Sequence, residues 1–566
     1  MEAPADPAIV IVTSDARMRR ILEEEVSSRY GHDYLTVTAA EVTQGSAVLD
    51  KLAGEGRPVA LILACFGPHD RQGIEFLAGC QSAHPAAQRG IVVTWGDFGS
   101  ADQVFEALAN GKVNLQLICP EQRRDEEFHS SITDALEDWQ LVRGEGFEAV
   151  RIIGEQWSPR CHQLRDLLSR NHIPTRFYDS DTPTGAQLLA DLGLDSPALP
   201  VVILLFTPAG TVLEDPSDME LADAFGLIQP IPADEVFDVI VIGAGPAGLS
   251  AVVYAASEGL RTLVVEQEAV GGQAGTSSMI RNYPGFSRGV SGAKLAFRAF
   301  QQAWSFGAQF HFMRSATSLR AAGKDERIVT FSDGTMARCK SVIIATGVAY
   351  RKLEIAEVDE LIGRGVYYGA AVTESASIIG KDVVVVGGGN SAGQAALHLA
   401  SYARSVTILV RGGDISPSMS EYLIRQLDQT RNVEVRLRGA VTGGGGPGHL
   451  DHVVVTDLDT GQQDRLSAAG LFLFIGSRPN TNWLAGTVVR DEWGFVVTGE
   501  DLEQFGDAPR DGHPASLLET SMPGVLAVGD VRRGSVKRVA SAVGEGAVAI
   551  QLVHSYLDHA RHHALA

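Results

Sequence analysis

The sequence predicts an α/β protein of several domains, because two glycine-rich loops each connect an apolar strand to a helix. The first loop, Gly243-Ala-Gly245-Pro-Ala-Gly248, follows the apolar run 237–242. The second, Gly387-Gly-Gly389-Asn-Ser-Ala392, follows the apolar run 382–386. Backbone N–H groups at the start of such a helix bind a diphosphate. The chain therefore contains two candidate dinucleotide sites.

Length and composition limit what the protein does. A chain of 566 residues is too long for one hydrophobic core. Its formal net charge of −22 argues against nucleic acid or an anionic membrane as the main partner. No apolar run approaches the roughly 20 residues of a membrane span, and the N-terminus lacks a signal-peptide pattern. We therefore expect a cytoplasmic protein without a membrane span.

The cysteines do not follow a metal-binding or disulfide pattern. They are widely scattered along the chain, and we expect no metal site. The five are Cys65, Cys80, Cys119, Cys161 and Cys339.

An acidic residue follows the first loop at the spacing of a ribose-binding residue. The run Thr262-Leu-Val-Val-Glu266 begins about 20 residues after the loop, and Glu266 is expected to bind a ribose hydroxyl. Further short motifs follow at Gly271-Gly-Gln273, at Ala345-Thr-Gly347 and, near the end of the chain, at Gly529-Asp530.

With these motifs, residues 235–566 resemble the thioredoxin reductases. The resemblance implies a flavoprotein with two Rossmann-like dinucleotide-binding domains, in which 235–353 and 474–566 bind FAD and 354–473 bind NAD(P)H. It also implies a homodimer. Asp530 would accept a hydrogen bond from the ribityl or pyrophosphate-linked part of FAD, and the N–H groups near Arg538 would face the flavin. The alternative for Arg538 is an ordinary surface charge. The FAD-binding residues implied are Gly243, Gly245, Gly248, Glu266, Gly272, Gln273, Asn282, Thr346, Gly347, Gly529, Asp530, Arg538, Val539 and Ala540.

The second loop is expected to bind a nicotinamide nucleotide. The strand after it ends at Arg411 rather than at an acid, and an arginine pairs with a 2′-phosphate, which favours NADPH. Thioredoxin reductases have two adjacent basic residues here, whereas this chain has one, so NADH binding and very weak nucleotide binding remain the alternatives. The residues expected to bind this nucleotide are Gly387, Gly389, Asn390, Ser391, Ala392 and Arg411.

The redox-active Cys-x-x-Cys pair of thioredoxin reductases is missing. Gly369 and Val372 stand at its two positions, and neither exchanges a disulfide. The flavin would instead reduce an external acceptor, such as a ferredoxin-like carrier, a quinone or oxygen, as in the related ferredoxin–NADP reductases. Tyr367 and Tyr368 would shield the flavin or serve ordinary packing. The alternatives are a flavin-based redox sensor that signals through the N-terminal domains, and a disulfide reductase that uses Cys161 or a partner thiol.

Residues 147–230 resemble a glutaredoxin-like or thioredoxin-like domain. The strand 150–154, a helix that opens at Ser158-Pro-Arg-Cys161 and the following Pro200 occur in that family's order, and Pro200 takes the place of its cis-proline. Ser158 replaces the leading cysteine, so we expect no working dithiol. Cys161 is interpreted either as a packed residue or as a reactive thiol.

Residues 1–142 resemble a response-regulator receiver domain of flavodoxin-like fold. Apolar strands are predicted at 8–12, 59–63, 90–94 and 115–119. Cys65 stands where the family has its phosphorylated aspartate, and only Asp15 remains of the acidic pair that holds magnesium. We therefore expect a pseudo-receiver that is not phosphorylated and that supplies a binding surface for an unknown partner.

Overall fold

The computed structural model describes most of the chain in two compact units. One unit comprises Met1–Phe147 and Asp428–Arg431, and the other comprises Glu148–Leu427 and Asn432–Ala566. The described residues are 6–565 except 68–69, 110, 122, 144–146, 172, 208–209, 229, 232–234, 278, 287–288, 324, 370–376 and 507–514. Among them, no helix is long and apolar enough to cross a bilayer.

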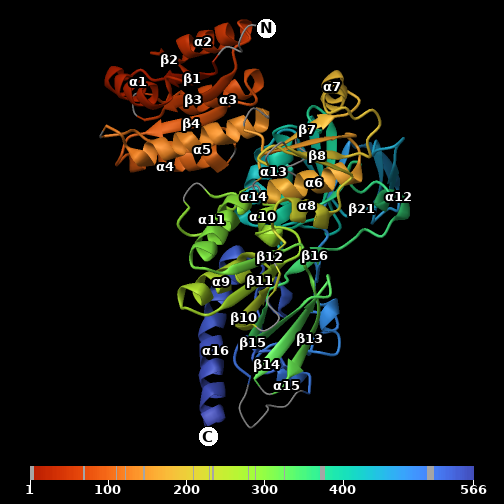
Figure 1. Ribbon diagram of the computed structural model, residues 1–566. Coiled ribbons are helices and arrows are strands. Elements are labelled where there is room, and N and C mark those ends of the chain that lie inside the picture. Colours follow the sequence, from red (N-terminus) through yellow and green to blue (C-terminus); the bar gives the residue numbers. More distant parts are fainter. Residues whose placement is uncertain are drawn as a thin grey trace. The chain divides into compact units, whose positions relative to one another are not determined.

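The first unit is a parallel five-stranded sheet with helices on both faces (Figure 1). Its strand order, β2-β1-β3-β4-β5, is one of the two common orders of a doubly wound sheet. The strands are β1 (Ala8–Val12), β2 (Leu35–Ala39), β3 (Val59–Cys65), β4 (Gln88–Val93) and β5 (Leu115–Ile118). The helices are α1 (Ala16–Tyr30), α2 (Val42–Gly54), α3 (Gly73–Ala83), α4 (Ala101–Ala109) and α5 (Glu126–Arg143).

The strands of this sheet are buried on both faces. On β1, Ile9 and Ile11 pack with α1 and α5, whereas Val10 and Val12 pack with α2, α3 and α4. Alternate side chains of a strand point to opposite faces, so a continuous apolar run is what a two-sided sheet requires. The four predicted strands are confirmed. The sequence analysis missed β2, in which polar threonines alternate with apolar residues.

The second unit begins with a small mixed sheet, which we call the mixed-sheet domain (residues 148–228). Its strand order is β7-β6-β8-β9, with β6 and β7 parallel and β8 antiparallel to β6. The Leu199–Pro200 peptide bond before β8 is cis. The elements are β6 (Val150–Gly154), α6 (Pro159–Arg170), β7 (Thr175–Asp179), α7 (Pro183–Asp191), β8 (Val201–Leu204), β9 (Thr211–Glu214) and α8 (Asp218–Ala224).

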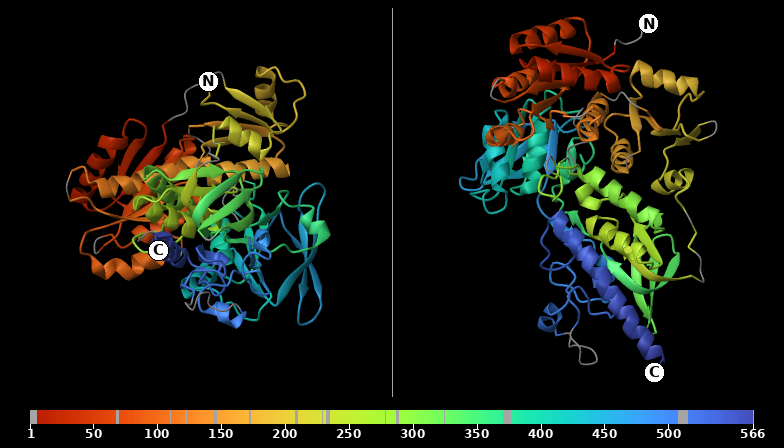
Figure 2. Two further views of the ribbon diagram at one scale, coloured as in Figure 1. Left: turned by 60° about the horizontal axis from the view of Figure 1, so that its bottom comes forward. Right: turned by 90° about the vertical axis from the view of Figure 1, so that its left-hand side faces the viewer.

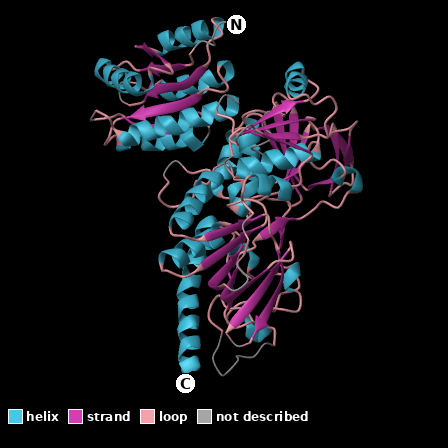
Figure 3. Cartoon of the chain, viewed as in Figure 1, coloured by secondary structure: helices cyan, strands magenta, loops and turns pink. Residues whose placement is uncertain are grey.

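Two larger α/β domains follow, each containing one glycine-rich loop. We call them the first-loop domain (235–353 and 474–566) and the second-loop domain (354–473). The main sheet of the first-loop domain has the order β12-β11-β10-β15-β14-β13, with β26 added beside β15, so the chain returns to it after the second-loop domain. Figure 3 shows its strands with helices alongside.

The long C-terminal helix α16 packs against α9, the helix that follows the first loop (Figure 2). Val239 and Val241 of β10 pack beneath these helices, while Ile240 and Ile242 face a second core on the other side of the sheet. The first loop is therefore fixed between a buried strand and a buried helix.

The elements of the first-loop domain are β10 (Val236–Ile242), α9 (Pro246–Ser257), β11 (Thr262–Glu266), α10 (Gly272–Gly275), α11 (Gly292–Ser305), β12 (Gln309–Phe312), β13 (Ala316–Ala322), β14 (Glu326–Phe331), β15 (Met336–Ile344), β16 (Val348–Tyr350), β25 (Ser477–Pro479), η2 (Asn482–Leu484), α15 (Asp501–Gln504), β26 (Val525–Ala527), η4 (Gly529–Val531) and α16 (Val539–Leu565).

The second-loop domain has a parallel sheet of order β17-β24-β18-β19-β20 and a separate antiparallel sheet of β21, β22 and β23. Its elements are α12 (Ala356–Asp359), β17 (Val366–Tyr368), β18 (Asp382–Val386), α13 (Asn390–Ala400), β19 (Ser405–Val410), α14 (Glu421–Gln429), β20 (Val433–Leu437), β21 (Gly439–Gly445), β22 (His452–Asp457), β23 (Gln463–Ser467) and β24 (Gly470–Leu473).

Candidate functional site

The glycines of the first loop are required by close backbone contacts. Gly243 has a φ of +105°, and a Cβ added there would lie 2.4 Å from the carbonyl oxygen of Ala345. A Cβ on Gly248 would lie 1.9 Å from the carbonyl oxygen of Gly243. Only glycine therefore permits the strand, the loop and the helix to pack this closely.

The middle glycine of this loop, Gly245, faces open space instead. A Cβ on Gly245 would have no neighbour within 4 Å, and Gly245 precedes α9 without a side-chain hydrogen bond that caps the helix. The first N–H groups of α9 thus have no capping side chain. Such a helix start fits a diphosphate.

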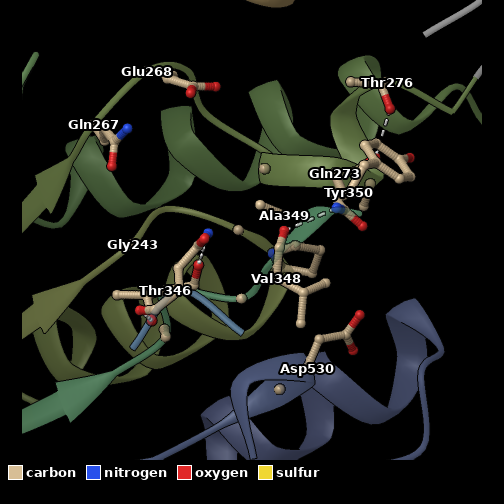
Figure 4. A pocket seen from close by; sticks show the side chains of 18 of the residues that line it. Gly243, Gln267, Glu268, Gln273, Thr276, Thr346, Val348, Ala349, Tyr350 and Asp530 are labelled. Atoms are coloured by element: carbon tan, nitrogen blue, oxygen red, sulfur yellow. Dashed lines mark hydrogen bonds between the residues drawn. The ribbon is translucent and has the colours of Figure 1, made fainter. Parts of the chain in front are cut away.

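Gly245 lies in the wall of a cavity of about 810 Å³ (Figure 4). This cavity, which we call the central cavity, brings together most residues implied as FAD ligands. Those that line it are Gly243, Gly245, Glu266, Gly272, Gln273, Thr346, Gly347, Gly529, Asp530, Arg538 and Val539. Gly248, Asn282 and Ala540 do not line it, and Asn282 is exposed.

Glu266 ends β11 as predicted, but its carboxylate is buried and already bound to the backbone. Oε2 accepts a hydrogen bond from the N–H of Ala244 at 2.6 Å, and Oε1 accepts one from the N–H of Glu268 at 2.9 Å. Burial raises its pKa despite these bonds. A carboxylate has about four acceptor sites, so two remain for ribose hydroxyls.

Asp530 belongs to the short helix η4, which Glu545 holds in place. The N–H of Gly529 donates to Oε2 of Glu545 at 2.6 Å, and Arg532 forms an ion pair with the same carboxylate. Asp530, Val348 and Tyr350 all line the central cavity, and Figure 4 shows their side chains. Burial raises the pKa of Asp530, with a smaller opposing effect of Lys537.

The Thr346-Gly347 crossover is held by a residue that the sequence analysis missed. The side-chain amide of Asn480 donates to the carbonyl of Thr346 at 3.0 Å, and its backbone N–H donates to the carbonyl of Gly347 at 3.1 Å. The side chain of Gln273 donates to the carbonyl of Val348 at 2.8 Å. Asn480 is 134 residues from Thr346 in sequence, and no local pattern indicates that pairing.

The second loop shares the central cavity through the helix that follows it. Gly389 precedes α13 without a capping side chain, and Ser391, Gln394 and Ala395 of that helix line the cavity. The other predicted ligands of the second nucleotide do not line it. They are Gly387, Gly389, Asn390, Ala392 and Arg411.

Asn390 is fixed by a hydrogen bond, whereas Arg411 is exposed. The Asn390 side chain accepts a hydrogen bond from the N–H of Ser420 at 2.7 Å, which ties the loop to the segment before α14. Arg411 is exposed at the end of β19, in the position predicted from the sequence. A loop glycine is again required, because a Cβ on Gly387 would lie 2.6 Å from the carbonyl oxygen of Phe474.

An aromatic ring lies beside Gly369, which the sequence analysis predicted to replace a redox cysteine. Gly369 has a φ of +85°, and a Cβ there would lie 2.4 Å from Cε2 of Tyr350. Both residues line the central cavity, and burial raises the pKa of the Tyr350 hydroxyl. A cysteine at 369 would therefore be strained and would collide with the ring. Val372 lies outside the described residues.

None of the five cysteines lines the central cavity, and all five are buried without a disulfide. Burial raises the pKa of each thiol. A thiol in apolar surroundings is inert because the reactive form is the thiolate.

The two tyrosines before Gly369 have packing contacts and also reach the cavity. Tyr367 is 3% exposed and packs against Phe472. The hydroxyl of Tyr368 accepts a hydrogen bond from the N–H of Leu353 and donates to Asp359. Both also line the central cavity, so packing and a shielding role are compatible.

In the mixed-sheet domain, Ser158 caps α6. Its hydroxyl accepts a hydrogen bond from the N–H of Cys161 at 3.4 Å. Cys161 is 0% exposed, and its Sγ fills the space beside Gly154 and Pro200. This geometry favours the interpretation of Cys161 as a packed residue.

In the first unit, Asp15, the residue that remains of the family's acidic pair, caps a helix. Asp15 caps α1 by accepting hydrogen bonds from the N–H groups of Arg17 and Met18. Cys65 ends β3, two residues beyond the predicted end of that strand, and is buried, with a pKa raised to about 12 by burial. The sequence analysis missed Asp70, which accepts a hydrogen bond from the hydroxyl of Thr13 at 2.7 Å. No group of three metal-binding side chains occurs among the described residues.

Comparison with known proteins identifies the part of the chain that contains both loops. The family model of the pyridine nucleotide-disulphide oxidoreductases matches residues 237–546. The chain is 33% identical over 324 residues to a 34.2 kDa protein in the rubredoxin operon of Clostridium pasteurianum, covering 57% of this chain and 98% of that protein. It is 30% identical to the thioredoxin reductase of Bacillus subtilis, covering 57% of this chain and 96% of the relative.

Solved structures agree with this assignment. The thioredoxin reductase of Lactococcus lactis in its FR conformation superposes with a TM-score of 0.52 at 29% identity, over 57% of this chain and 99% of that one. The thioredoxin reductase of T. acidophilum superposes with a TM-score of 0.51 at 29% identity, over 58% and 99%.

Proposed function

Because the chain belongs to the pyridine nucleotide-disulphide oxidoreductase family and is thioredoxin reductase-like, we propose that it is an FAD-dependent NADPH oxidoreductase that reduces an external acceptor. The observation that carries this proposal is the central cavity. Residues of both loop domains line it, and no cysteine does.

The first loop fits FAD by its chemistry. The uncapped start of α9 suits a diphosphate, the free acceptor positions of Glu266 suit ribose hydroxyls, and the start of α16 at Val539 suits an electron-rich ring edge. When bound there, FAD would supply the two-electron carrier between the nicotinamide and the acceptor. The chain's own residues would bind it, orient it and exclude water.

The second loop is proposed to bind NADPH. Its Gly389 and Ser391 lie at the start of α13, and the exposed Arg411 follows the next strand. The guanidinium of Arg438 lies near the segment that follows Arg411. One of its nitrogens is 3.1 Å from the position that a Cβ would take on Gly413. Arg438 also pairs with Asp459, so Arg411 is the cation available for a 2′-phosphate.

The acceptor is proposed to be external because the cavity offers no sulfur. Gly369 faces Tyr350, and Cys161 is sealed inside the mixed-sheet domain. A ferredoxin-like carrier, a quinone or oxygen fits this arrangement. A disulfide relay through Cys161 does not, since a thiol without exposure meets no partner.

The proposal is tested by cofactor analysis and rapid kinetics. We expect purified protein to be yellow and to release FAD, not FMN, on denaturation. In anaerobic stopped-flow experiments NADPH should bleach the flavin faster than NADH does, and one of a panel of carriers, quinones and dyes should support roughly 1–1,000 turnovers per second. Colourless protein that takes up no FAD would refute the assignment. Efficient NADPH-dependent reduction of thioredoxin would refute the external acceptor.

A further inference from the structure

One wall of the central cavity comes from outside both loop domains. Helix α6 of the mixed-sheet domain contributes His162, Asp166 and Arg170 to its lining. These residues are four positions apart, and that spacing places them on one face of a helix. The helix therefore lies along the cavity with a polar face toward it.

Arg170 connects this helix to the ribose-binding strand end. Its side chain is 16% exposed and forms ion pairs with Glu268 at 3.0 Å and with Asp166 at 3.4 Å. The N–H of Glu268 donates to Glu266, whose other oxygen accepts from Ala244 of the first loop. Arg170, Glu268, Glu266 and the loop thus form one continuous polar chain.

The other end of α6 is anchored on the second-loop domain. Pro159 fits against Gly363, where an added Cβ would lie 3.0 Å from the Cα of Pro159. The His162 ring lies 5.0 Å from that of Tyr367. Just before the helix, Trp157 stacks on His449 with a centroid distance of 4.7 Å. Contacts at both ends fix the helix beside the cavity.

Two charged residues of this helix line the same cavity as the predicted ribose-binding residue. Asp166 and Arg170 line it together with Glu266 and Glu268. Asp166 offers carboxylate acceptors and Arg170 offers guanidinium donors, and a hydroxyl group pairs with either kind because it both donates and accepts. The predicted ligand group of that kind at Glu266 is the ribose of FAD.

We propose that α6 completes the FAD site, and that Asp166 and Arg170 bind the ribose of the adenosine part of FAD. This inference rests on the proposed binding of FAD at the first loop. Its consequence is that the mixed-sheet domain contributes to the affinity for FAD.

The test measures FAD affinity of the full-length protein directly. Apoprotein is titrated with FAD, and the fluorescence change of the cofactor gives the dissociation constant. Arg170→Ala should weaken FAD binding roughly ten- to hundredfold, the effect of a lost charged hydrogen bond. Arg170→Lys keeps the charge beside Glu268 but loses the planar guanidinium fork, and should weaken binding by a smaller factor.

The matched control is Arg160→Ala. Arg160 lies on the same helix but pairs with Asp218 of its own domain and does not line the cavity. The affinity of the Arg160→Ala variant for FAD should stay within about twofold of wild type, as expected for the loss of a partly exposed ion pair. Circular dichroism and the thermal midpoint with and without FAD establish that each variant folds.

The outcomes separate this inference from the proposed function. Wild-type protein that binds no FAD would refute the proposed function. Wild-type protein that binds FAD, with Arg170→Ala and Arg170→Lys binding it equally well, would refute only the role of α6. If Arg170→Ala does not fold, Asp166→Asn replaces it, and unchanged affinity in that variant would likewise overturn the inference.

Discussion

The two glycine-rich loops look alike in sequence but differ in how their surroundings are built. The first is followed by a buried carboxylate, Glu266, whose two oxygens are fixed by backbone N–H groups. The second is followed by the exposed cation Arg411. A site with buried, fixed polar groups suits a cofactor that stays bound. A site with an exposed charge suits a nucleotide that arrives and leaves.

The largest expected effect is at the last position of the loop motif, where the two loops differ: the first has Gly248 and the second has Ala392. Gly248→Ala places a methyl group 1.9 Å from the carbonyl oxygen of Gly243, so the backbone has to move. We expect a loss of roughly 3 kcal/mol or more in the free energy of unfolding. The reverse change in the second loop, Ala392→Gly, removes a buried methyl group from α13 and should cost only about 1 kcal/mol. Urea unfolding monitored by circular dichroism measures both, and equal costs would break the comparison.

A pH dependence should follow from the buried polar groups of the first-loop domain. His311 is 3% exposed, and burial together with the nearby Arg314 lowers its pKa to about 4. The unfolded chain then binds more protons than the folded one between about pH 6.5 and 4, so stability falls as the pH drops through that range. The loss from this residue should be roughly 3 kcal/mol once the pH is below both pKa values. His311→Gln should flatten the slope of unfolding free energy against pH, and an unchanged slope would contradict this assignment.

The exposed cation of the second loop is tested by nucleotide preference. Arg411→Ala removes the only basic side chain at the end of β19 and should weaken NADPH binding by about 1.5–3 kcal/mol, or roughly ten- to hundredfold. NADH lacks the 2′-phosphate, so its affinity should stay within about twofold. Initial rates of flavin reduction at varied nucleotide concentrations measure both. Equal weakening of the two nucleotides would show that Arg411 is only a surface charge.

The smallest expected effect concerns Cys161. Its thiol is buried and away from the central cavity, so Cys161→Ser should leave NADPH-dependent dye reduction within about twofold of wild type. The thermal midpoint of the variant, measured alongside the assay, shows whether a loss of turnover reflects lost stability rather than lost chemistry. A severe loss of turnover in a folded variant would favour the disulfide relay instead.

The sequence predicted local features well and distant ones poorly. The strand at 262–266 and the starts of α9, α13 and α6 were predicted from apolar runs, glycine spacing and the Ser158-Pro-Arg-Cys161 motif, which are all local signals. The contacts of Asn480 with Thr346 and of Glu545 with Gly529 join segments that no spacing rule connects. The cavity face of α6 was missed for the same reason, since Arg170 and Glu268 are 98 residues apart.

Some predictions from resemblance are still untested. The receiver-like and glutaredoxin-like identities of the N-terminal domains, the homodimer and the cytoplasmic location remain predictions. Asn282 was implied as an FAD ligand but is exposed and does not line the central cavity. A motif transferred by resemblance gives a position in sequence, and it does not fix the direction of a loop.

The most direct test of the central claim is the number of electrons that the protein takes up. In an anaerobic titration with NADPH, followed by the absorbance of the flavin, a protein whose only redox centre is FAD bleaches completely at about one equivalent per flavin. A protein with an additional redox-active dithiol takes up about two equivalents. We predict one equivalent, since no cysteine lines the central cavity and all five cysteines are buried. An end point at two equivalents would contradict the account.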